Sequence, residues 1–500
     1  MIQIAENIEL DPISEGLIPE GVVSHYVVPK GAVEDVSNFH NDNLGVMTFR
    51  PNLVSHFTPA ATPVSSSLFQ TAVGSNRIYW QEGTSLKYVQ IESPGSVTTY
   101  TSVFPSSFTA RYQTIQSNLL AIAGNTIKYT DGSASPANIS GITYPAVTID
   151  ILNAGFQGRL WYASSSAINN RLYYSDVIPA AGVASTTGTS PYLTINAPNG
   201  DAITGLASSQ QVLFAFCHNS IFRVYNTQSQ DNSPCAFVGA LNQEAIVTTP
   251  DGIYFYHPSG FYKLSSDGSA QSISNRIASI LPYSGQVDVT SCRSWSSGDY
   301  VYFSFSYPFP SGGGTVNGSK VYRYTISTQV WTIYDFYKSV VTTACFGLSR
   351  TGTQYVFLLG TTAESVARFA AIFVEYKWDG TISTTASSID LSSTDIIASY
   401  STHFESFGIE NRLKQIQGLA IPHLNGNGFD ISYQTDMDNS DEWTPIGRLD
   451  NNAVTLFKNF QSKPFNRIKF RVSGSKRTSN LSTYCWVRQP IIIKLSDVGI

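Results

Sequence analysis

One short motif recurs along most of this chain: a turn residue followed at once by a run of β-branched and aromatic residues. It reads Asn-Arg-Ile-Tyr-Trp at 76–80 and Asn-Ser-Ile-Phe-Arg-Val-Tyr at 219–225. Asn, Asp and Gly tolerate the positive φ that closes a hairpin, and the residues that follow place side chains alternately on the two faces of a strand. The motif therefore predicts short hairpins in sheets that stack face to face. Further copies lie at 125–129, 158–162, 170–174, 251–255, 260–264, 298–303, 320–324 and 354–358.

The spacing of these units favours a β-propeller. Successive units begin near residues 77, 125, 159, 219, 252, 300 and 355, an irregular series that centres near the roughly 40–50 residues of a propeller blade. A propeller closes its sheets radially and leaves only short edges. We therefore predict an all-β chain with a degenerate β-propeller over residues 66–385, of five to seven blades with six expected. Two β-sandwiches in series are the alternative.

Composition excludes several other classes. Charged residues make up 13% of the chain, about half the usual share, so a coiled coil or helical bundle is excluded. The 42% of hydrophobic residues, with 28 Tyr and 28 Phe, can bury a large core and exclude disorder. Five Cys without a CxxC pair are too few for a disulfide scaffold and are expected to be buried free thiols of a reducing compartment.

The two ends of the chain differ from its middle. Residues 1–65 are acidic, contain six prolines and lack the strand motif, so we predict an extended N-terminal arm ordered by a neighbouring molecule. Residues 386–500 begin with a polar linker and then contain longer alternating strands, such as 429–434 and 467–472. Such alternation is typical of half-buried antiparallel strands and predicts a C-terminal β-sandwich over 386–500.

Charge is segregated between these ends. The net charge is −5, yet residues 1–50 hold eight acidic residues against two basic ones. An acidic head and a basic tail could steer self-assembly or partner choice. The predicted strand 467–472 has Arg467, Lys469 and Arg471 on one face. This basic strand could face DNA phosphates or an acidic partner, or its basic face could simply be solvated. No aromatic residue lies among the basic ones on that face to stack on single-stranded DNA. The candidate interface or DNA-facing residues are Lys458, Lys463, Arg467, Lys469, Arg471, Lys476 and Arg477.

No motif for catalysis or cofactor binding stands out. No two His have metal-ligand spacing, and His218 and its neighbour Cys217 would point to opposite faces of a strand. The turn at 432–443 resembles an Asp-box with altered spacing, and its Asp436, Asp438 and Asp441 could supply oxygens to Ca²⁺, although a structural hairpin is favoured. No pair of carboxylates suits a glycosidase. We predict no enzyme activity, no cofactor and no metal.

Several segments together resemble one protein family. They are the strand pairs 158–163 with 170–176 and 212–216 with 219–225, the segments 237–241 and 253–262, and the C-terminal strands 431–436 and 467–472. Together they resemble the tail nozzle, or packaged-DNA stabilisation, proteins of short-tailed bacteriophages, over about residues 70–500. The acidic segment 1–65 is not matched.

The resemblance implies a structural virion protein, assembled in the host cytoplasm and located in the phage tail. Six copies would form a ring below the portal and its adaptor, retain the packaged double-stranded DNA and conduct it at ejection. Tail fibres or spikes would be further partners. Stable membrane insertion is not expected, since the apolar run 369–374 is too short to span a bilayer. A carbohydrate- or receptor-binding tail propeller and a sialidase-like glycosidase are the alternatives.

Overall fold

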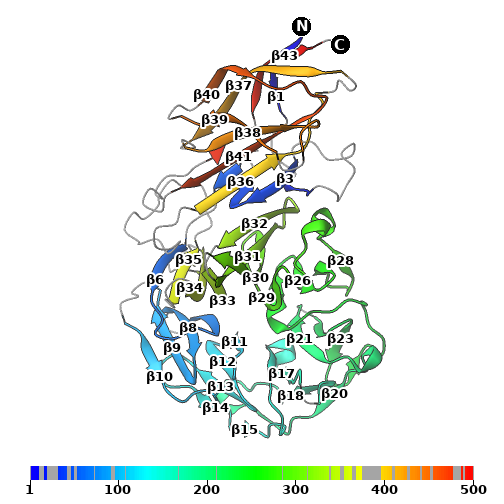
Figure 1. Ribbon diagram of the computed structural model, residues 1–500. Helices are drawn as coiled ribbons and strands as arrows, with labels where there is room; N and C mark the ends of the chain where they lie inside the picture. The colour runs from blue at the N-terminus through cyan, green and yellow to red at the C-terminus, as the bar shows by residue number, and fades with distance from the viewer. Residues whose placement is uncertain are drawn as a thin grey trace.

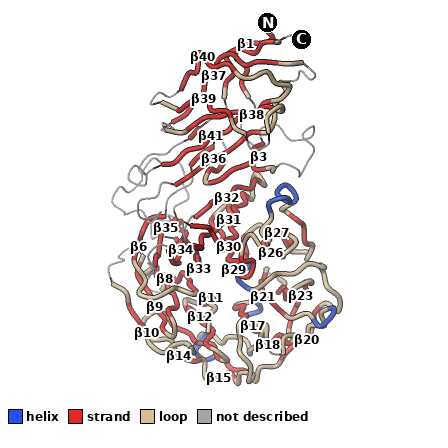
Figure 2. Tube along the Cα trace, in the orientation of Figure 1, coloured by secondary structure: helices blue, strands red, loops and turns tan. Residues whose placement is uncertain are grey.

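The computed structural model shows a chain built almost wholly of strands (Figure 2). Among the described residues the helical elements are short 3-10 turns: η1 (Phe156–Gly158), η2 (Val183–Ser185), η3 (Pro198–Gly200), η4 (Gln243–Ala245) and η5 (Asn275–Ile280). The structure describes residues 2–10, 16–19, 32–41, 47–49, 53–71, 74–91, 96–106, 108–166, 168–209, 211–283, 285–311, 314–336, 339–348, 354–362, 368–373, 396–407, 412–424, 428–439, 442–450, 454–476, 486–487 and 490–498.

The middle of the chain is a β-propeller, so the predicted fold class is confirmed. Its described residues form seven four-stranded sheets arranged around a centre (Figure 1), where six blades were expected. Each of the seven motif units noted in the sequence starts in or beside a different blade, so the expected number was one too low. Adjacent blades pack through buried aromatic rings, as between Phe216 of one blade and Phe255 of the next, 5.3 Å apart.

The blades follow one another in chain order, and each runs from an inner to an outer strand. The first three comprise β7 (Ser65–Gln70), β8 (Asn76–Glu82), β9 (Ser85–Gln90) and β10 (Thr98–Tyr100); β11 (Tyr112–Ile115), β12 (Asn118–Ala123), β13 (Thr126–Thr130) and β14 (Ala137–Asn138); and β16 (Ile151–Ala154), β17 (Leu160–Ala163), β18 (Arg171–Tyr174) and β20 (Tyr192–Thr194). β15 (Gly141–Ile142), which follows the second blade in sequence, pairs in parallel with β19 (Thr187–Gly188), which lies between β18 and β20 of the third.

The remaining blades include the longest hairpin of the propeller, β30–β31. They comprise β21 (Ile203–Ser208), β22 (Leu213–Cys217), β23 (Ile221–Asn226) and β24 (Ser229–Gln230); β25 (Ile246–Thr249), β26 (Gly252–His257), β27 (Gly260–Leu264) and β28 (Ala270–Ser272); β29 (Asp288–Ser297), β30 (Tyr300–Ser311), β31 (Gly314–Thr325) and β32 (Val330–Phe336); and β33 (Ser339–Leu348), β34 (Gln354–Thr362), β35 (Arg368–Phe373) and β6 (Leu53–Phe57).

The seventh blade closes the ring with a strand from the N-terminal part of the chain. Its outer strand β6 pairs antiparallel with β35, more than 300 residues later in the sequence. Phe57 at the end of β6 packs against Trp80 of the first blade, with ring centroids 4.5 Å apart. Both rings belong to a buried cluster shared by the last and first blades, so their burial holds the two ends of the ring together.

Residues 1–65 do not form a separate arm, which corrects the prediction. β6 belongs to the propeller, and β1 to β5 supply strands to a β-sandwich whose other strands come from the C-terminal part. One sheet has β1 (Ile2–Glu9), β43 (Ile491–Asp497), β37 (Lys414–Leu424), β42 (Trp486–Val487), β5 (Met47–Phe49) and β4 (Phe39–Asn41), with β40 (Val454–Gln461) paired to β37. The other has β2 (Gly16–Leu17), β3 (Ala32–Ser37), β36 (Ile396–Thr402), β41 (Ile468–Lys476), β38 (Asp430–Thr435) and β39 (Thr444–Arg448).

The propeller is thus inserted between two halves of the sandwich. The first and last strands, β1 and β43, are antiparallel neighbours, and the two termini lie together at the end of the molecule farthest from the propeller (Figure 1). The sequence did not indicate this arrangement, because β1 and β3 pair with strands more than 300 residues away. The linker predicted at 387–394 lies outside the described residues.

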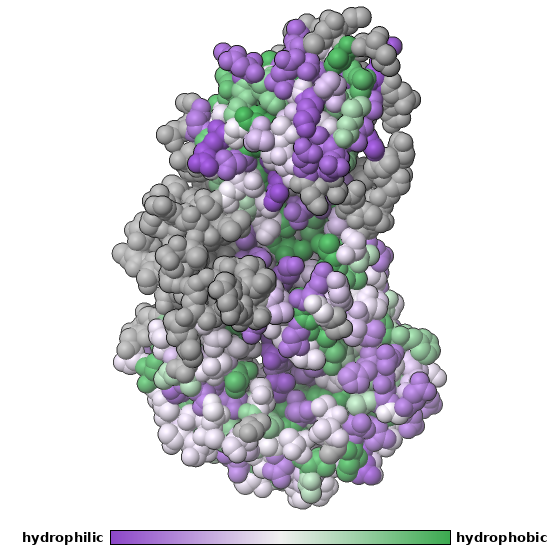
Figure 3. Space-filling view, in the orientation of Figure 1, coloured by the Kyte–Doolittle hydropathy of each residue, from purple (hydrophilic) through white to green (hydrophobic). Residues whose placement is uncertain are grey.

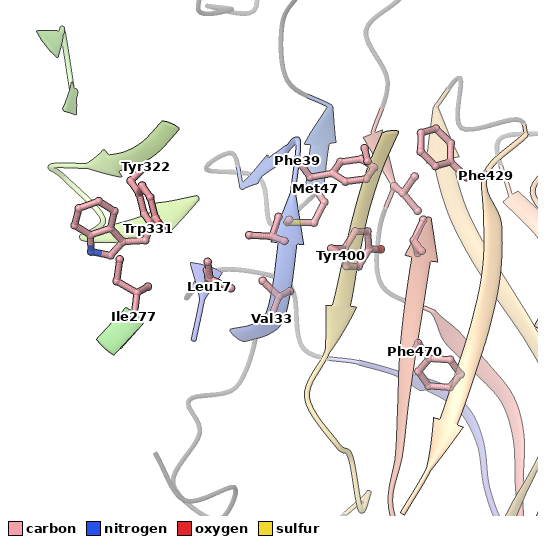
Figure 4. Packing of buried hydrophobic residues seen from close by; sticks show 14 of the residues in the cluster. Leu17, Val33, Phe39, Met47, Ile277, Tyr322, Trp331, Tyr400, Phe429 and Phe470 are labelled. Carbon is pink, nitrogen blue, oxygen red and sulfur yellow. The ribbon is translucent and has the colours of Figure 1, made fainter. Parts of the chain in front are cut away.

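A continuous core joins the sandwich to the propeller. It holds Leu17 and Val33 of the N-terminal strands together with Ile277 and Trp331 of the propeller, and Figure 4 shows Leu17 between the two parts. At the same junction, Asn38 donates its main-chain N–H to the carbonyl of Ile333 at 3.0 Å and accepts the N–H of Asp335 on its side-chain oxygen at 2.8 Å. These bonds cover the outer edge of β32, which would otherwise expose unpaired backbone groups.

Candidate functional site

The basic strand predicted from the sequence is β41. Ile468, Phe470 and Val472 are buried at 0–1% exposure, while Lys469 and Arg471 occupy the alternate positions, so the predicted alternation is confirmed. β41 lies between β36 and β38 and is antiparallel to both. Its outer face is therefore the middle of a sheet rather than an edge.

Acidic residues of the N-terminal strands meet this face within the same chain. Lys469 donates two hydrogen bonds to the carboxylate of Glu34, at 3.0 and 2.8 Å. Their side chains are only 7% and 12% exposed. In the next row across the sheet, Asp35 pairs with Ser401 and Ser401 pairs with Arg471. One acidic residue of the N-terminal strands thus neutralises one basic residue of β41 within the same chain.

Two aromatic residues that the sequence analysis missed also lie on this face. The Nζ of Lys469 lies 4.7 Å and the Cζ of Arg467 lies 5.6 Å from the centre of the Phe404 ring. The Nζ of Lys469 lies 5.5 Å and the Cζ of Arg471 lies 5.6 Å from the centre of the Trp443 ring. The expectation of a face without aromatic residues is therefore wrong, because Phe404 and Trp443 come from loops 26 to 65 residues away in the sequence. Cation–π contacts of this kind each contribute about 0.5–1 kcal/mol near a surface.

The other predicted basic residues do not lie with Arg467, Lys469 and Arg471 among these aromatic and acidic partners. Lys463 is bound to Asp438 at 2.7 Å, and Lys458 is exposed on β40, in the other sheet. Lys476 ends β41, but its side chain lies outside the described residues, as does the whole of Arg477. The seven residues therefore do not form one patch, and most of those described carry an acidic or aromatic partner.

The turn after β38 is held by protein donors. Asp438 accepts hydrogen bonds from the main-chain N–H and the hydroxyl of Thr435, both at 2.8 Å. Asp436 accepts the N–H groups of Asn466 and Arg467. Although burial opposes it, the bonds from Lys463 and Thr435 lower the pKa of Asp438. These contacts support the structural hairpin. Asp441 lies outside the described residues, among which no group of three metal-ligating side chains gathers.

The described cysteines are free thiols, as predicted. Cys217, Cys292 and Cys345 are buried, and burial raises the pKa of Cys217 to about 12. His218, next to Cys217, is exposed, so the expected opposite orientation of these two side chains is confirmed. A thiol with a raised pKa is a poor nucleophile. Cys235 is half-buried, and Cys485 lies outside the described residues.

A second charged cluster, not noticed in the sequence, lies at the centre of the propeller. Arg111, just before β11, and Arg293 of β29 both bind Glu244 of η4; the Arg293 Nε to Glu244 Oε2 distance is 2.5 Å. The three residues come from the second, fifth and sixth blades and line a cavity of about 190 Å³. Nothing in the sequence could indicate this triad, because its members are up to 182 residues apart and none lies in a motif.

The surface around these sites is mixed rather than dominated by one kind of side chain. Hydrophilic and hydrophobic residues alternate over the face seen in Figure 3. Among the described residues the most exposed large apolar side chain is that of Phe237, at 81%. Within the part of the chain that the structure describes, no helix is both long and apolar enough to cross a membrane.

Comparison with known proteins shows likeness at the level of the fold. No family model matches this sequence, and no curated protein matches it significantly. Among solved structures, the C-terminal WD40 domain of Sif2 matches with a TM-score of 0.39 and 10% identity, covering 66% of this chain and 100% of that domain. The Cps50 (Swd1) β-propeller domain of Myceliophteria thermophila matches with a TM-score of 0.40 and 8% identity, over 66% of this chain and 100% of that one.

A third solved structure covers more of the chain. The extracellular domain of the putative hybrid two component system BT4673 from B. thetaiotaomicron matches with a TM-score of 0.45 and 11% identity, covering 89% of this chain and 63% of that one. At such identities the likeness concerns the fold alone, which is a β-propeller.

Proposed function

We propose that this chain is a structural, non-enzymatic subunit of a short-tailed phage tail: a tail nozzle protein that forms a ring, continues the portal channel and conducts DNA. The observation that carries the proposal is the placement of the segments that resemble that family. Segments 158–163 and 170–176 contain the hairpin β17–β18, and 253–262 spans the hairpin β26–β27. Segments 431–436 and 467–472 fall in the neighbouring sandwich strands β38 and β41.

The charge arrangement supports a conduit more than a DNA-binding surface. Affinity for DNA rises with the number of phosphates that free Lys and Arg neutralise. Here Lys469 is bound to Glu34 and Lys463 to Asp438, so these cations would have to give up an internal partner to bind a phosphate. A surface with few free cations lets DNA slide with little friction.

The channel of such a ring would lie between subunits. The Arg111–Glu244–Arg293 triad crosses the centre of the propeller, and the cavity there holds about 190 Å³. Side chains joined by ion pairs across this centre leave no opening along the propeller axis for a duplex, whose major groove alone is about 12 Å wide. A lumen wide enough for DNA therefore requires several copies of the chain around a common axis.

A receptor-binding role is the second candidate, favoured by one observation. Phe237 is 81% exposed on a segment fixed on both sides: Ala236 bridges to Ile221, and Ala240 donates to the carbonyl of Cys217 at 3.1 Å. Exposed aromatic residues on rigid supports are typical anchors of binding sites.

The decisive experiment is to measure assembly of the full chain. We expect negative-stain images and light scattering to show rings, alone at high concentration or with the portal and adaptor proteins. Arg471→Glu should weaken assembly if the basic face of β41 lies in the ring interface. The matched control is Arg448→Glu, at an exposed residue that pairs with Asp430 in the same sheet. A protein that stays monomeric at every concentration and never joins the portal complex would contradict the proposal.

A further inference from the structure

The cavity at the centre of the propeller carries an unbalanced positive charge. Of the described residues that line it, Arg111, Arg293 and Glu244 are charged at neutral pH, which leaves one positive charge over. Burial raises the pKa of Tyr112, so this lining phenol stays neutral. The hydroxyls of Ser66 and Thr343 bond to one another at 2.8 Å and add no negative charge.

Arg111 also has donor capacity that nothing in the described structure uses. Its Nη1 binds Glu244, but its Nε is buried and has no acceptor among the described residues. A buried donor without a partner is unfavourable, so an added acceptor at this position would be stabilising. Arg293 differs, because its Nε and Nη1 also donate to the carbonyls of Thr342 and Cys292 at 3.0 and 2.8 Å.

The cluster is rigidly supported. Glu244 lies in η4, whose first turn is capped by the side chain of Asn242 accepting the N–H of Ala245 at 2.9 Å. Ser294 donates to the carbonyl of Glu244 at 2.7 Å. On the other side, the carbonyl of Arg111 accepts the N–H of Ile122 at 2.9 Å. The backbone that carries Glu244 and Arg111 is therefore held in place on both sides of the cavity.

We propose that this cavity binds a small oxyanion, a carboxylate or a phosphate, held by Arg111 and Arg293 beside Glu244. A guanidinium group presents a planar fork that matches such oxygens, and an anion would satisfy the Nε of Arg111 and cancel the surplus charge. The cavity of about 190 Å³ equals the liquid volume of about six water molecules, which suits phosphate or a short dicarboxylate. The site is independent of the proposed role in a phage tail.

Glu244 sets the strength of the site. Its carboxylate occupies the same two guanidinium groups and repels an incoming anion, so binding to the native protein is held weak. Removing that charge leaves two cationic groups facing the cavity and strengthens binding. This gives the proposal a signature that a merely structural ion pair lacks: a substitution at Glu244 should improve binding.

The test is thermal denaturation and calorimetric titration of the full chain with sodium phosphate and sodium malonate, against sodium chloride at matched ionic strength. We expect both oxyanions to raise Tm more than chloride does. Arg111→Gln should weaken binding about tenfold, as expected for loss of a charge-assisted hydrogen bond, and Glu244→Gln should tighten it about tenfold. Arg448→Gln, far from the cavity and paired with Asp430 on the sandwich, should leave binding unchanged.

Circular dichroism shows whether each variant is folded. If Arg111→Gln fails to fold, Arg111→Lys keeps the charge but removes the Nε donor and should still weaken binding several-fold. The proposal is overturned if phosphate and malonate bind no better than chloride to the native chain and no better than chloride to Glu244→Gln. It is equally overturned if the folded Arg111 variant binds as tightly as the native chain does.

Discussion

The ion pair between Glu34 and Lys469 tests whether the N-terminal segment is a built-in part of the sandwich. Their closest charged atoms are 2.8 Å apart, and the side chains are 12% and 7% exposed. At that distance the attraction is about 6 kcal/mol with an effective dielectric constant of about 20, most of which is offset by desolvation. Loss of one partner strands a largely buried charge, so the net effect remains large.

We expect Glu34→Gln to lower the free energy of unfolding by about 2–3 kcal/mol, somewhat below the 3–5 kcal/mol of a fully buried pair. The reason is that Phe404 and Trp443 still face the Lys469 ammonium group. Lys469→Met should cost about as much, since it removes the ammonium group that donates two hydrogen bonds to the Glu34 carboxylate. In the double variant the losses should not add, and the coupling energy should be about 2 kcal/mol.

The measurement is a double-mutant cycle by urea denaturation, with hydrogen exchange of β3 to localise the effect. The control is the same cycle on Arg448 and Asp430, which also pair at 2.9 Å but are 66% and 55% exposed; an exposed pair should show a coupling below about 1 kcal/mol. Equal coupling in the two cycles, or unchanged exchange protection of β3, would refute the reasoning that residues 32–37 belong to the sandwich.

Three further predictions concern single positions. Glu82→Gln should lower the free energy of unfolding by about 2–3 kcal/mol in urea denaturation, because the buried carboxylate accepts bonds from Trp80, Lys87 and two main-chain N–H groups of the segment after β6; a loss below half a kilocalorie would contradict this. Burial lowers the pKa of His423 below its ordinary 6.5, so the unfolded chain binds a proton that the folded chain resists, and stability should fall as pH drops below about 6.5. His423→Gln should flatten that slope in urea denaturation at several pH values, and an unchanged slope would exclude His423 as its source. Gly239→Ala should reduce Tm strongly, since the added Cβ would lie 1.8 Å from the carbonyl oxygen of Cys217; a Tm like that of the native chain would show that the segment can shift.

Local patterns in the sequence were sufficient for the propeller. Each turn followed by a strand, such as 219–225, is read from adjacent residues, and every blade contains one or two copies of this motif. Six blades were expected, and the described residues form seven. Spacing alone also does not show that β6, from the N-terminal part of the chain, completes the last blade. The half-buried character of β41 also followed from its alternation.

The candidate sites were only partly predictable. The sequence identified Lys469 and Arg471 as neighbours on one face, but not that Glu34, Phe404 and Trp443 would cover them. The central triad of the propeller was not predicted at all. Within one strand, every second side chain lies on the same face, and this can be predicted from sequence. Contacts between side chains of different strands depend on which strands pair, and this cannot.

The sequence by itself determined that this chain is all-β, where its hairpins close and which side chains of a strand such as β41 share a face. Those properties depend on φ preferences and side-chain alternation within a few residues. Only the tertiary structure decided that β1 pairs with β43 and that the propeller is inserted within a split sandwich. Sheet pairing is made by backbone hydrogen bonds that every residue offers alike, so neither strand carries a mark of its partner. The sequence therefore did not show that Glu34, from the acidic end of the chain, and Lys469, from the basic end, form an ion pair in the fold.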